Sequence, residues 1–191
     1  MSRNRFLVYI LLVYIYFPIT TVQAETEKNN IELLSKARDL FYMSLEDESK
    51  VDSAISLYEE LGHTYSLKGK SLTYIGALYA IKGKHAFSPF TKLKWVNKGL
   101  EIMDQGLHES PEDIEALFIH GSTCFYLPFF FNRKRDAKEN FSTIINLLPT
   151  KYDNYSSELI LNMIEFFEIN LNLEEKELNL LSQIKKEIVS N

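Results

Sequence analysis

The chain has 191 residues, a formal charge of −5 at neutral pH and one cysteine, and 46% of its residues are hydrophobic. An acidic chain opposes the counterion-releasing contacts that nucleic acids and anionic membrane surfaces require, so nucleic acid is not expected as a partner. The single cysteine, Cys124, excludes an internal disulfide, so packing alone must stabilise the fold.

The N-terminus has the pattern of a secretory signal peptide. Arg3 and Arg5 precede an unbroken apolar run over residues 6–17, and small residues before Ala24 provide a cleavage site. The run is shorter than the roughly 20 apolar residues that span a bilayer. The sequence therefore predicts a signal peptide over residues 1–24, cleavage after Ala24, a periplasmic or secreted protein and no stable membrane insertion after cleavage. The alternative is an uncleaved anchor.

Residues 25–191 form one predicted domain, in which apolar residues recur at steps of three and four. This period is typical of helices, and no clear strand alternation interrupts it, so the predicted fold is all-α. About eight helices are expected, and their predicted ranges are 31–45, 51–61, 69–83, 93–107, 111–125, 136–149, 156–170 and 173–189. Ser110 is predicted to cap the fifth helix and Pro149 to end the sixth. Short connections between these helices favour stacked antiparallel hairpins, with the last hairpin, about 155–190, as a polar cap.

The sequence carries an internal repeat, because Leu117-x2-His120-Gly121-x2-Cys124 has the same frame as Leu72-x2-Ile75-Gly76-x2-Tyr79. The stretch Leu72-x2-Ile75-Gly76-x2-Tyr79 resembles the first-helix half of a tetratricopeptide repeat (TPR). The stretch Ala137-x3-Phe141-x2-Ile144-x4-Pro149 resembles the second-helix half. The resemblance covers roughly residues 33–149 and is that of a TPR-like exported bacterial protein. It implies a right-handed α-solenoid in which small residues let paired helices approach closely. An irregular helical bundle with coincidental spacings is the alternative.

The resemblance also implies a concave groove lined by the first helix of each hairpin. Its positions correspond to Lys70, Thr73, Ala77, Ala80, Glu115, Phe118, Ser122 and Phe125. This set is small and apolar, and it lacks the lysine and asparagine set with which some family members bind a C-terminal carboxylate. The implied partner is a protein or peptide.

No motif in the sequence indicates catalysis. The four histidines lack the spacing of a zinc site, and the chain has no Gly-rich phosphate loop and no nucleophile elbow. No enzyme activity, cofactor or metal is therefore expected. His120 is expected at the edge of the core with a hydrogen bond to the backbone, and Cys124 on a packed helix face.

Two segments combine aromatic residues with cations. Residues 84–95 are predicted to be an inserted loop, and residues 128–135 a second loop that projects from the same end of the stack. One interpretation is that the aromatic side chains cover the end of the core. The other is that they bind a partner. The candidate anchors are His85, Phe87, Phe90, Trp95 and Arg133.

Two functions compete on this reasoning. The first is a scaffold in the cell envelope that holds a protein or peptide in an open groove. The second is a soluble carrier or accessory subunit that binds a small ligand in a closed pocket between the two aromatic loops. Because open helical stacks seldom enclose pockets, the scaffold is the leading hypothesis.

Overall fold

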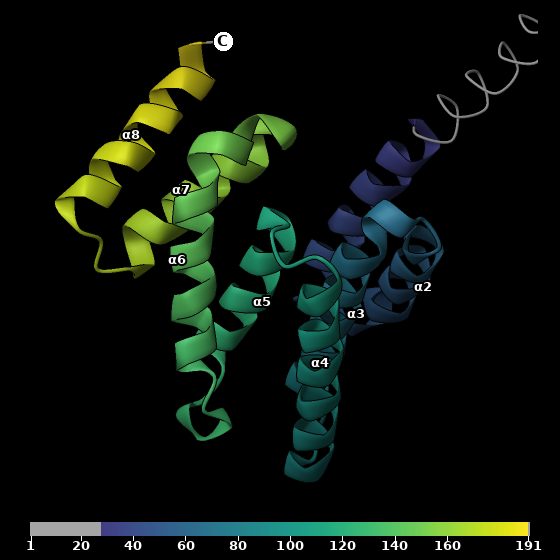
Figure 1. The fold of residues 1–191 in the computed structure, drawn as a ribbon. Helices are drawn as coiled ribbons and strands as arrows, with labels where there is room; N and C mark the ends of the chain where they lie inside the picture. Colours follow the sequence, from purple (N-terminus) through teal and green to yellow (C-terminus); the bar gives the residue numbers. More distant parts are fainter. Residues whose placement is uncertain (1–27, 191) are drawn as a thin grey trace, which may run out of the picture.

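The computed structural model describes residues 28–190, and this part of the chain contains eight α-helices and no strand (Figure 1). The predicted all-α class is therefore confirmed for the described residues. The predicted signal peptide, residues 1–24, lies outside them. No helix within residues 28–190 is long and apolar enough to cross a bilayer.

The helices follow one another with short connections. The N-terminal helix spans residues 28–44 and is followed by α2 (Val51–Gly62), α3 (Lys68–His85), α4 (Pro89–Glu109), α5 (Ile114–Tyr126), α6 (Lys134–Lys151), α7 (Ser157–Asn170) and α8 (Glu175–Ser190). Short 3-10 turns lie in the connections at Glu48–Lys50, Tyr65–Leu67, Phe129–Phe131 and Tyr152–Asn154.

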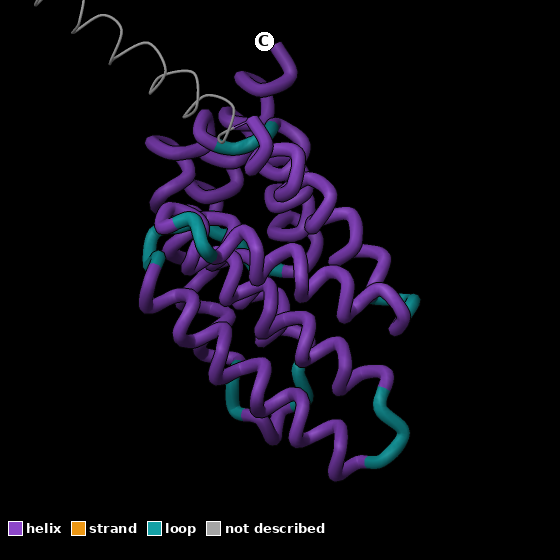
Figure 2. The backbone as a smooth tube through the Cα atoms, turned by 90° about the vertical axis from the view of Figure 1, so that its right-hand side faces the viewer, coloured by secondary structure: helices purple, strands orange, loops and turns teal. Residues whose placement is uncertain are grey.

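Neighbouring helices pair as antiparallel hairpins. The most extensive pairing joins α3 to α4, and the next joins α5 to α6. Adjacent hairpins stack through contacts of α2 with α3 and of α3 with α5. Helix α8 contacts both α7 and α6. The tube view in Figure 2 shows the connections α3–α4 and α5–α6 at the same, lower end of the molecule, as Figure 1 does. The sequence correctly placed these two connections at one end of the stack. The right-handed solenoid remains a prediction.

Helices α3 and α4 approach each other closely because glycines on each helix face backbone atoms of the other helix. A Cβ atom on Gly76 would lie 2.5 Å from the carbonyl oxygen of Gly99, and one on Gly99 would lie 2.8 Å from the amide nitrogen of Ala80. Two further contacts of this kind join Gly69 and Gly106. The small residues singled out at positions 76 and 99 therefore lie where the two helix backbones meet.

The predicted insertion over residues 84–95 is wrong. Residues 84 and 85 end α3, and α4 begins at Pro89, so only residues 86–88 are non-helical. Ser88 accepts a hydrogen bond from the amide of Thr91, and Pro89 occupies the first turn, where its missing N–H costs nothing. The aromatic and basic residues after Ser88 therefore belong to a helix.

Two predicted helix ends also differ from the structure. The side chain of Asp113, and not of Ser110, caps α5 by accepting a hydrogen bond from the Ala116 amide. Pro149 lies inside α6, which continues to Lys151. Pro149 has no N–H to donate to the carbonyl oxygen of Ile145, and the helix ends two residues later.

One hydrophobic core runs through all the hairpins. It extends from Ala37 in the N-terminal helix to Ile184 in α8. The last hairpin contributes Phe167, Leu181 and Ile184 to this core and keeps its charged face exposed. The described helices thus share one continuous interior, as a single domain requires.

Candidate functional site

A groove of about 400 Å³ lies between the N-terminal helix, α3 and α5. Its apolar wall is formed by Phe41, Tyr42, Leu45, Ala77, Ala80, Ile81, Phe118, Ile119, Tyr126 and Leu127, and its polar groups come from Lys84, Ser122 and Thr123. The volume falls within the range of small-ligand pockets, roughly 300 to 1,000 Å³. Because the lining is mainly apolar, the groove favours apolar side chains or ligands.

Four of the eight predicted groove residues line this groove. Ala77 and Ala80 supply its α3 side, and Phe118 and Ser122 supply its α5 side. Phe118 also packs edge to face on Phe166 of α7, with ring centroids 5.3 Å apart. Small side chains on α3 therefore leave space that larger residues would fill.

Three other predicted groove residues are buried beside the groove. The Thr73 hydroxyl donates a hydrogen bond to the carbonyl oxygen of Gly69 within α3. Lys70 forms an ion pair with Glu115, whose carboxylate has no exposed surface, at 2.7 Å. The only cation of the predicted set is thus committed to a partner within the protein and is not offered to a ligand.

Glu115 is the centre of a buried polar cluster. Arg38 donates to both of its carboxylate oxygens, each at 2.5 Å, and the Tyr74 hydroxyl donates to Oε1 at 2.7 Å. Burial alone would raise the pKa of Glu115, but Arg38 and Lys70 outweigh it and lower the pKa to about 2. The cluster ties the N-terminal helix, α3 and α5 together at one end of the groove.

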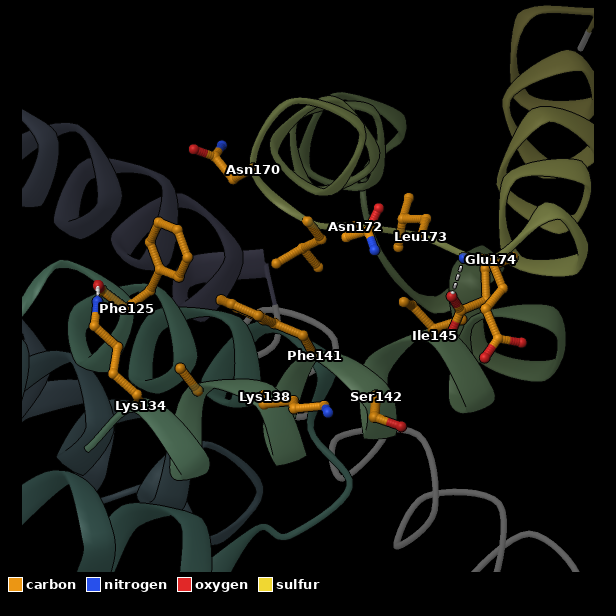
Figure 3. A pocket seen from close by; sticks show the side chains of 13 residues that line it. Phe125, Lys134, Lys138, Phe141, Ser142, Ile145, Asn170, Asn172, Leu173 and Glu174 are labelled. Atoms are coloured by element: carbon orange, nitrogen blue, oxygen red, sulfur yellow. Dashed lines mark hydrogen bonds between the residues drawn. The ribbon is translucent and has the colours of Figure 1, made fainter. Parts of the chain in front are cut away.

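Phe125, the last predicted groove residue, faces a different cavity. This second cavity of about 490 Å³ lies between α6 and the α7–α8 connection (Figure 3). Its wall includes Phe125, Phe141 and Ile145 together with Lys134 and Lys138. Phe125 also packs edge to face on Phe166 of α7 within a cluster of aromatic rings, so its role is to join α5 to α7.

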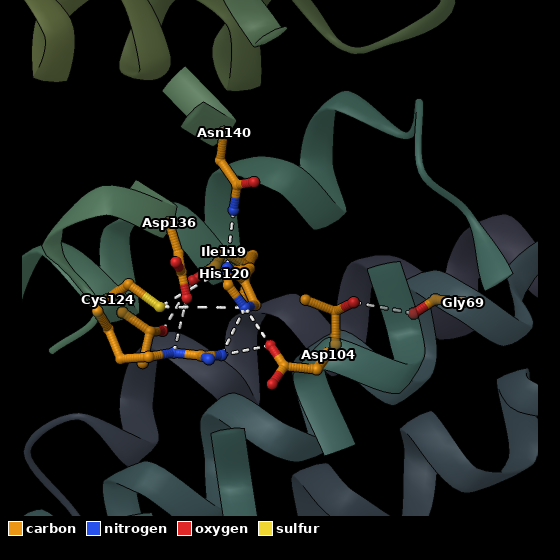
Figure 4. Close-up of polar contacts among 10 residues, drawn as sticks. Gly69, Asp104, Ile119, His120, Cys124, Asp136 and Asn140 are labelled. Atoms are coloured by element: carbon orange, nitrogen blue, oxygen red, sulfur yellow. Dashed lines mark hydrogen bonds and ion pairs between the residues drawn. The ribbon is translucent and has the colours of Figure 1, made fainter. Parts of the chain in front are cut away.

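A second polar cluster surrounds His120 (Figure 4). Its Nε2 atom lies 2.9 Å from Asp104 Oδ1, and its Nδ1 atom lies 2.7 Å from Asn140 Nδ2. Asn140 therefore donates to Nδ1, and the ring donates through Nε2 to Asp104. The expected backbone hydrogen bond of His120 is wrong, because side chains from α4 and α6 satisfy the ring instead.

Cys124 lies one turn after His120, with its sulfur 3.6 Å from Nδ1. A cysteine beside a histidine and an asparagine resembles the arrangement of a thiol nucleophile. The Cys124 side chain is fully buried, however, and burial raises the pKa of its thiol to about 11. Because the thiolate is the reactive form, this cysteine suits packing and not nucleophilic attack.

The predicted loop anchors have different environments. Phe87 and Phe90 are 102% and 88% exposed, so neither covers the core. Trp95 lies in α4 and stacks on Tyr79 of α3, with ring centroids 5.5 Å apart. Trp95 therefore joins the two helices of its own hairpin.

The other two anchors are engaged with backbone or acids. The His85 ring lies 2.9 Å from the carbonyl oxygen of Ser44, and Arg133 forms ion pairs with Asp104 and Asp136. Both residues hold hairpins together. The groove is lined by none of Phe87, Phe90, Phe129 or Phe130, so these four exposed phenylalanines do not close over it.

Among the described residues, no group of three or more His, Cys, Asp and Glu side chains could hold a metal ion.

The sequence did not predict the two polar clusters, since the members of each come from three or more helices. The helical period could have flagged Glu115 only as an acid on an apolar stripe.

No protein-family model, curated protein or solved structure matches this chain at a significant level. The similarity to tetratricopeptide repeats therefore depends on the repeat residues and on the hairpin pairing alone.

Proposed function

We propose that this protein is an exported, TPR-like scaffold that binds an apolar segment of a protein or peptide in the groove between the N-terminal helix, α3 and α5. The observation that carries the proposal is the groove itself. Ala77 and Ala80 leave it open on one side, and Phe118 offers an aromatic surface on the other. Grooves of this kind suit amphipathic helices, which insert apolar side chains at regular intervals.

The chemistry of the groove supports a partner of a defined class. Ten of its thirteen lining residues are apolar or aromatic, and Lys84 is its one charged residue. Lys84 donates to the Leu45 carbonyl oxygen and pairs with Glu46 at its rim. Specificity therefore comes from the shape and apolar surface of the bound segment rather than from its charge.

The signal peptide predicted over residues 1–24 supports a function outside the cytoplasm, in the periplasm or the medium of a bacterium. The residues of the Glu115 and His120 clusters do not line the groove, so they offer no reactive group to a molecule bound there. The buried Cys124 thiol also argues against a covalent step. Binding without catalysis is accordingly the function proposed, with no cofactor.

A carrier for a small apolar ligand is the competing function, because the groove volume alone would accommodate one. A carrier that holds its ligand between the two aromatic segments, residues 84–95 and 128–135, has less support, because the Phe87 and Phe90 side chains are exposed to solvent.

A matched pair of serine substitutions tests the proposal. Ser122→Phe would fill the groove, whereas Ser53→Phe would place the same side chain on the exposed face of α2. The chain from Glu25 would be used to capture proteins from the cell envelope. We expect one or more proteins to be recovered by the wild type and by Ser53→Phe and to be lost with Ser122→Phe. The carrier would be favoured if no such protein were recovered and a small apolar molecule were extracted from the wild type but not from Ser122→Phe.

A further inference from the structure

Half of the large, exposed hydrophobic side chains within residues 28–190 lie at two aromatic tips. The first aromatic tip is residues 84–95, and the second is residues 126–135. Six of the twelve such side chains in the described part of the chain lie there: Phe87, Phe90, Leu93, Tyr126, Phe129 and Phe130. Both tips lie at the lower end of the molecule in both views (Figures 1 and 2). Such a concentration marks an interaction surface.

The two tips are basic although the chain is acidic. All six charged residues in them are cations, namely Lys84, Lys92, Lys94, Arg133, Lys134 and Arg135, and neither segment contains an acid. The rest of the chain is therefore more acidic than the net charge of −5 indicates. Acids outside the two segments pair with three of these cations, since Glu46 pairs with Lys84, Asp104 and Asp136 with Arg133, and Glu139 with Arg135. The positive charge that the tips can offer therefore comes from the other three cations.

Several of these cations are available to a partner. Within residues 28–190, no ion pair engages Lys92, Lys94 or Lys134, and all three are exposed. Lys92 donates only to the carbonyl oxygen of Lys84, and Lys134 only to that of Phe125. Their charges are therefore not neutralised by an acid among the described residues.

We infer that the two aromatic tips dock this protein on an anionic phospholipid surface. Aromatic rings and basic side chains together are typical of membrane interfaces, where rings enter the headgroup region and cations contact lipid phosphates. The rings project from two separate hairpins, and the Phe87 side chain has no covering neighbour at 102% exposure. A bilayer accepts rings at any lateral spacing, whereas a protein partner would need two pockets at one fixed distance.

The docking proposed here is peripheral. The tips are helix ends joined by a few non-helical residues, and the described helices include none that could span the bilayer. Anionic lipids attract the tip lysines that no described acid pairs with, namely Lys92, Lys94 and Lys134, and repel the acidic remainder of the molecule, which favours an approach through these lysines. The net acidity from which the sequence argued against an anionic membrane does not apply to these three side chains.

The test uses the chain from Glu25, which retains every described helix and lacks the predicted signal peptide. Vesicles of phosphatidylglycerol and phosphatidylcholine in equal parts would be compared with vesicles of phosphatidylcholine alone in a flotation assay. We expect binding to the anionic vesicles only, and weaker binding at high salt.

Two variants locate the contact. The first variant replaces Phe87, Phe90, Phe129 and Phe130 with serine. The control variant replaces Ile31 and Val189 with serine; these side chains are 66% and 74% exposed and lie on other parts of the molecule. We expect the phenylalanine variant to lose at least about tenfold in apparent partitioning. The control should bind like the wild type. Circular dichroism and the melting temperature should be unchanged in both, because the replaced side chains are exposed.

Trp95 provides an independent measurement, because it is the only tryptophan of the chain and lies in the first aromatic tip. Brominated lipids should quench its fluorescence in anionic vesicles. Absence of binding, or equal binding by the phenylalanine variant, would overturn the proposal. So would a concentration-dependent dimer that the phenylalanine substitutions dissolve without any vesicle binding, since the tips would then bind a second copy of the chain.

Discussion

Arg38 in the N-terminal helix donates to both carboxylate oxygens of Glu115 in α5, although the two residues are 77 positions apart in the chain. The pair closes the first hairpin onto the third across α3, which contributes Lys70 and Tyr74 to the same carboxylate. Because the groove lies between these three helices, its shape depends on this contact.

Replacing Glu115 with alanine should destabilise the fold strongly. Arg38 and Lys70 would lose the carboxylate that compensates their partly or fully buried charges, and removing one partner of such a pair costs about 3 to 5 kcal/mol. The free energy of unfolding in urea measures the effect. Glu112→Ala is the matched control, because its ion pair with Lys151 is largely exposed and its loss should change little. Equal stability of the two variants would show that the cluster is not structural.

The same carboxylate makes stability depend on pH. The pKa of Glu115 is lowered from its ordinary value of 4.5 to about 2, so the folded state binds this proton less readily than the unfolded chain. Its contribution is therefore fully present above about pH 4.5 and is lost as the pH falls toward 2. Glu115→Gln removes that titration. We expect the stability difference between wild type and variant to shrink over this window, and a difference independent of pH would contradict the lowered pKa.

The close contact of α3 with α4 predicts a penalty for a single methyl group. A Cβ atom at Gly99 would meet backbone atoms of α3 below contact distance, so Gly99→Ala should destabilise by about 1 to 3 kcal/mol despite the better helix propensity of alanine. At Gly62 the nearest atom is the Ser71 side chain at 3.5 Å, an ordinary contact. Gly62→Ala should accordingly be neutral or slightly stabilising. Thermal melting of both variants checks this, and a neutral Gly99→Ala would mean that the helices can move apart.

Trp95 and Phe90, two of the aromatic residues of the first tip, should behave differently on truncation. Trp95 stacks on Tyr79 while Lys98 lies over the Tyr79 ring at 3.9 Å, so Trp95→Ala should cost roughly 1 to 2 kcal/mol. Phe90 is 88% exposed, and Phe90→Ala should leave the melting temperature unchanged. A large loss of stability in Phe90→Ala would show that its ring covers the core after all.

The helices and their order could be read from the sequence because apolar period and capping residues are local signals. The extension of α4 back to Pro89 was missed although Ser88-Pro89 is a local start signal, because the family period led us to expect an insertion there. No local signal predicts the partners of Glu115 and His120. Arg38, Lys70 and Asp104 reach them through the stacking of hairpins, and Asn140 reaches His120 across the α5–α6 hairpin. The stacking also separates the predicted groove residues into lining and buried sets.

The most direct measurement of the proposed function is site-specific photo-crosslinking from the groove in the cell. A photoreactive phenylalanine analogue at Ala80 would stand in the groove, and the same residue at Ser53 would stand on the exposed face of α2. The account predicts a discrete protein adduct from position 80 that is absent from position 53 and is suppressed by Ser122→Phe. Adducts that form equally from both positions, or none from position 80, would contradict the binding of a protein segment in this groove.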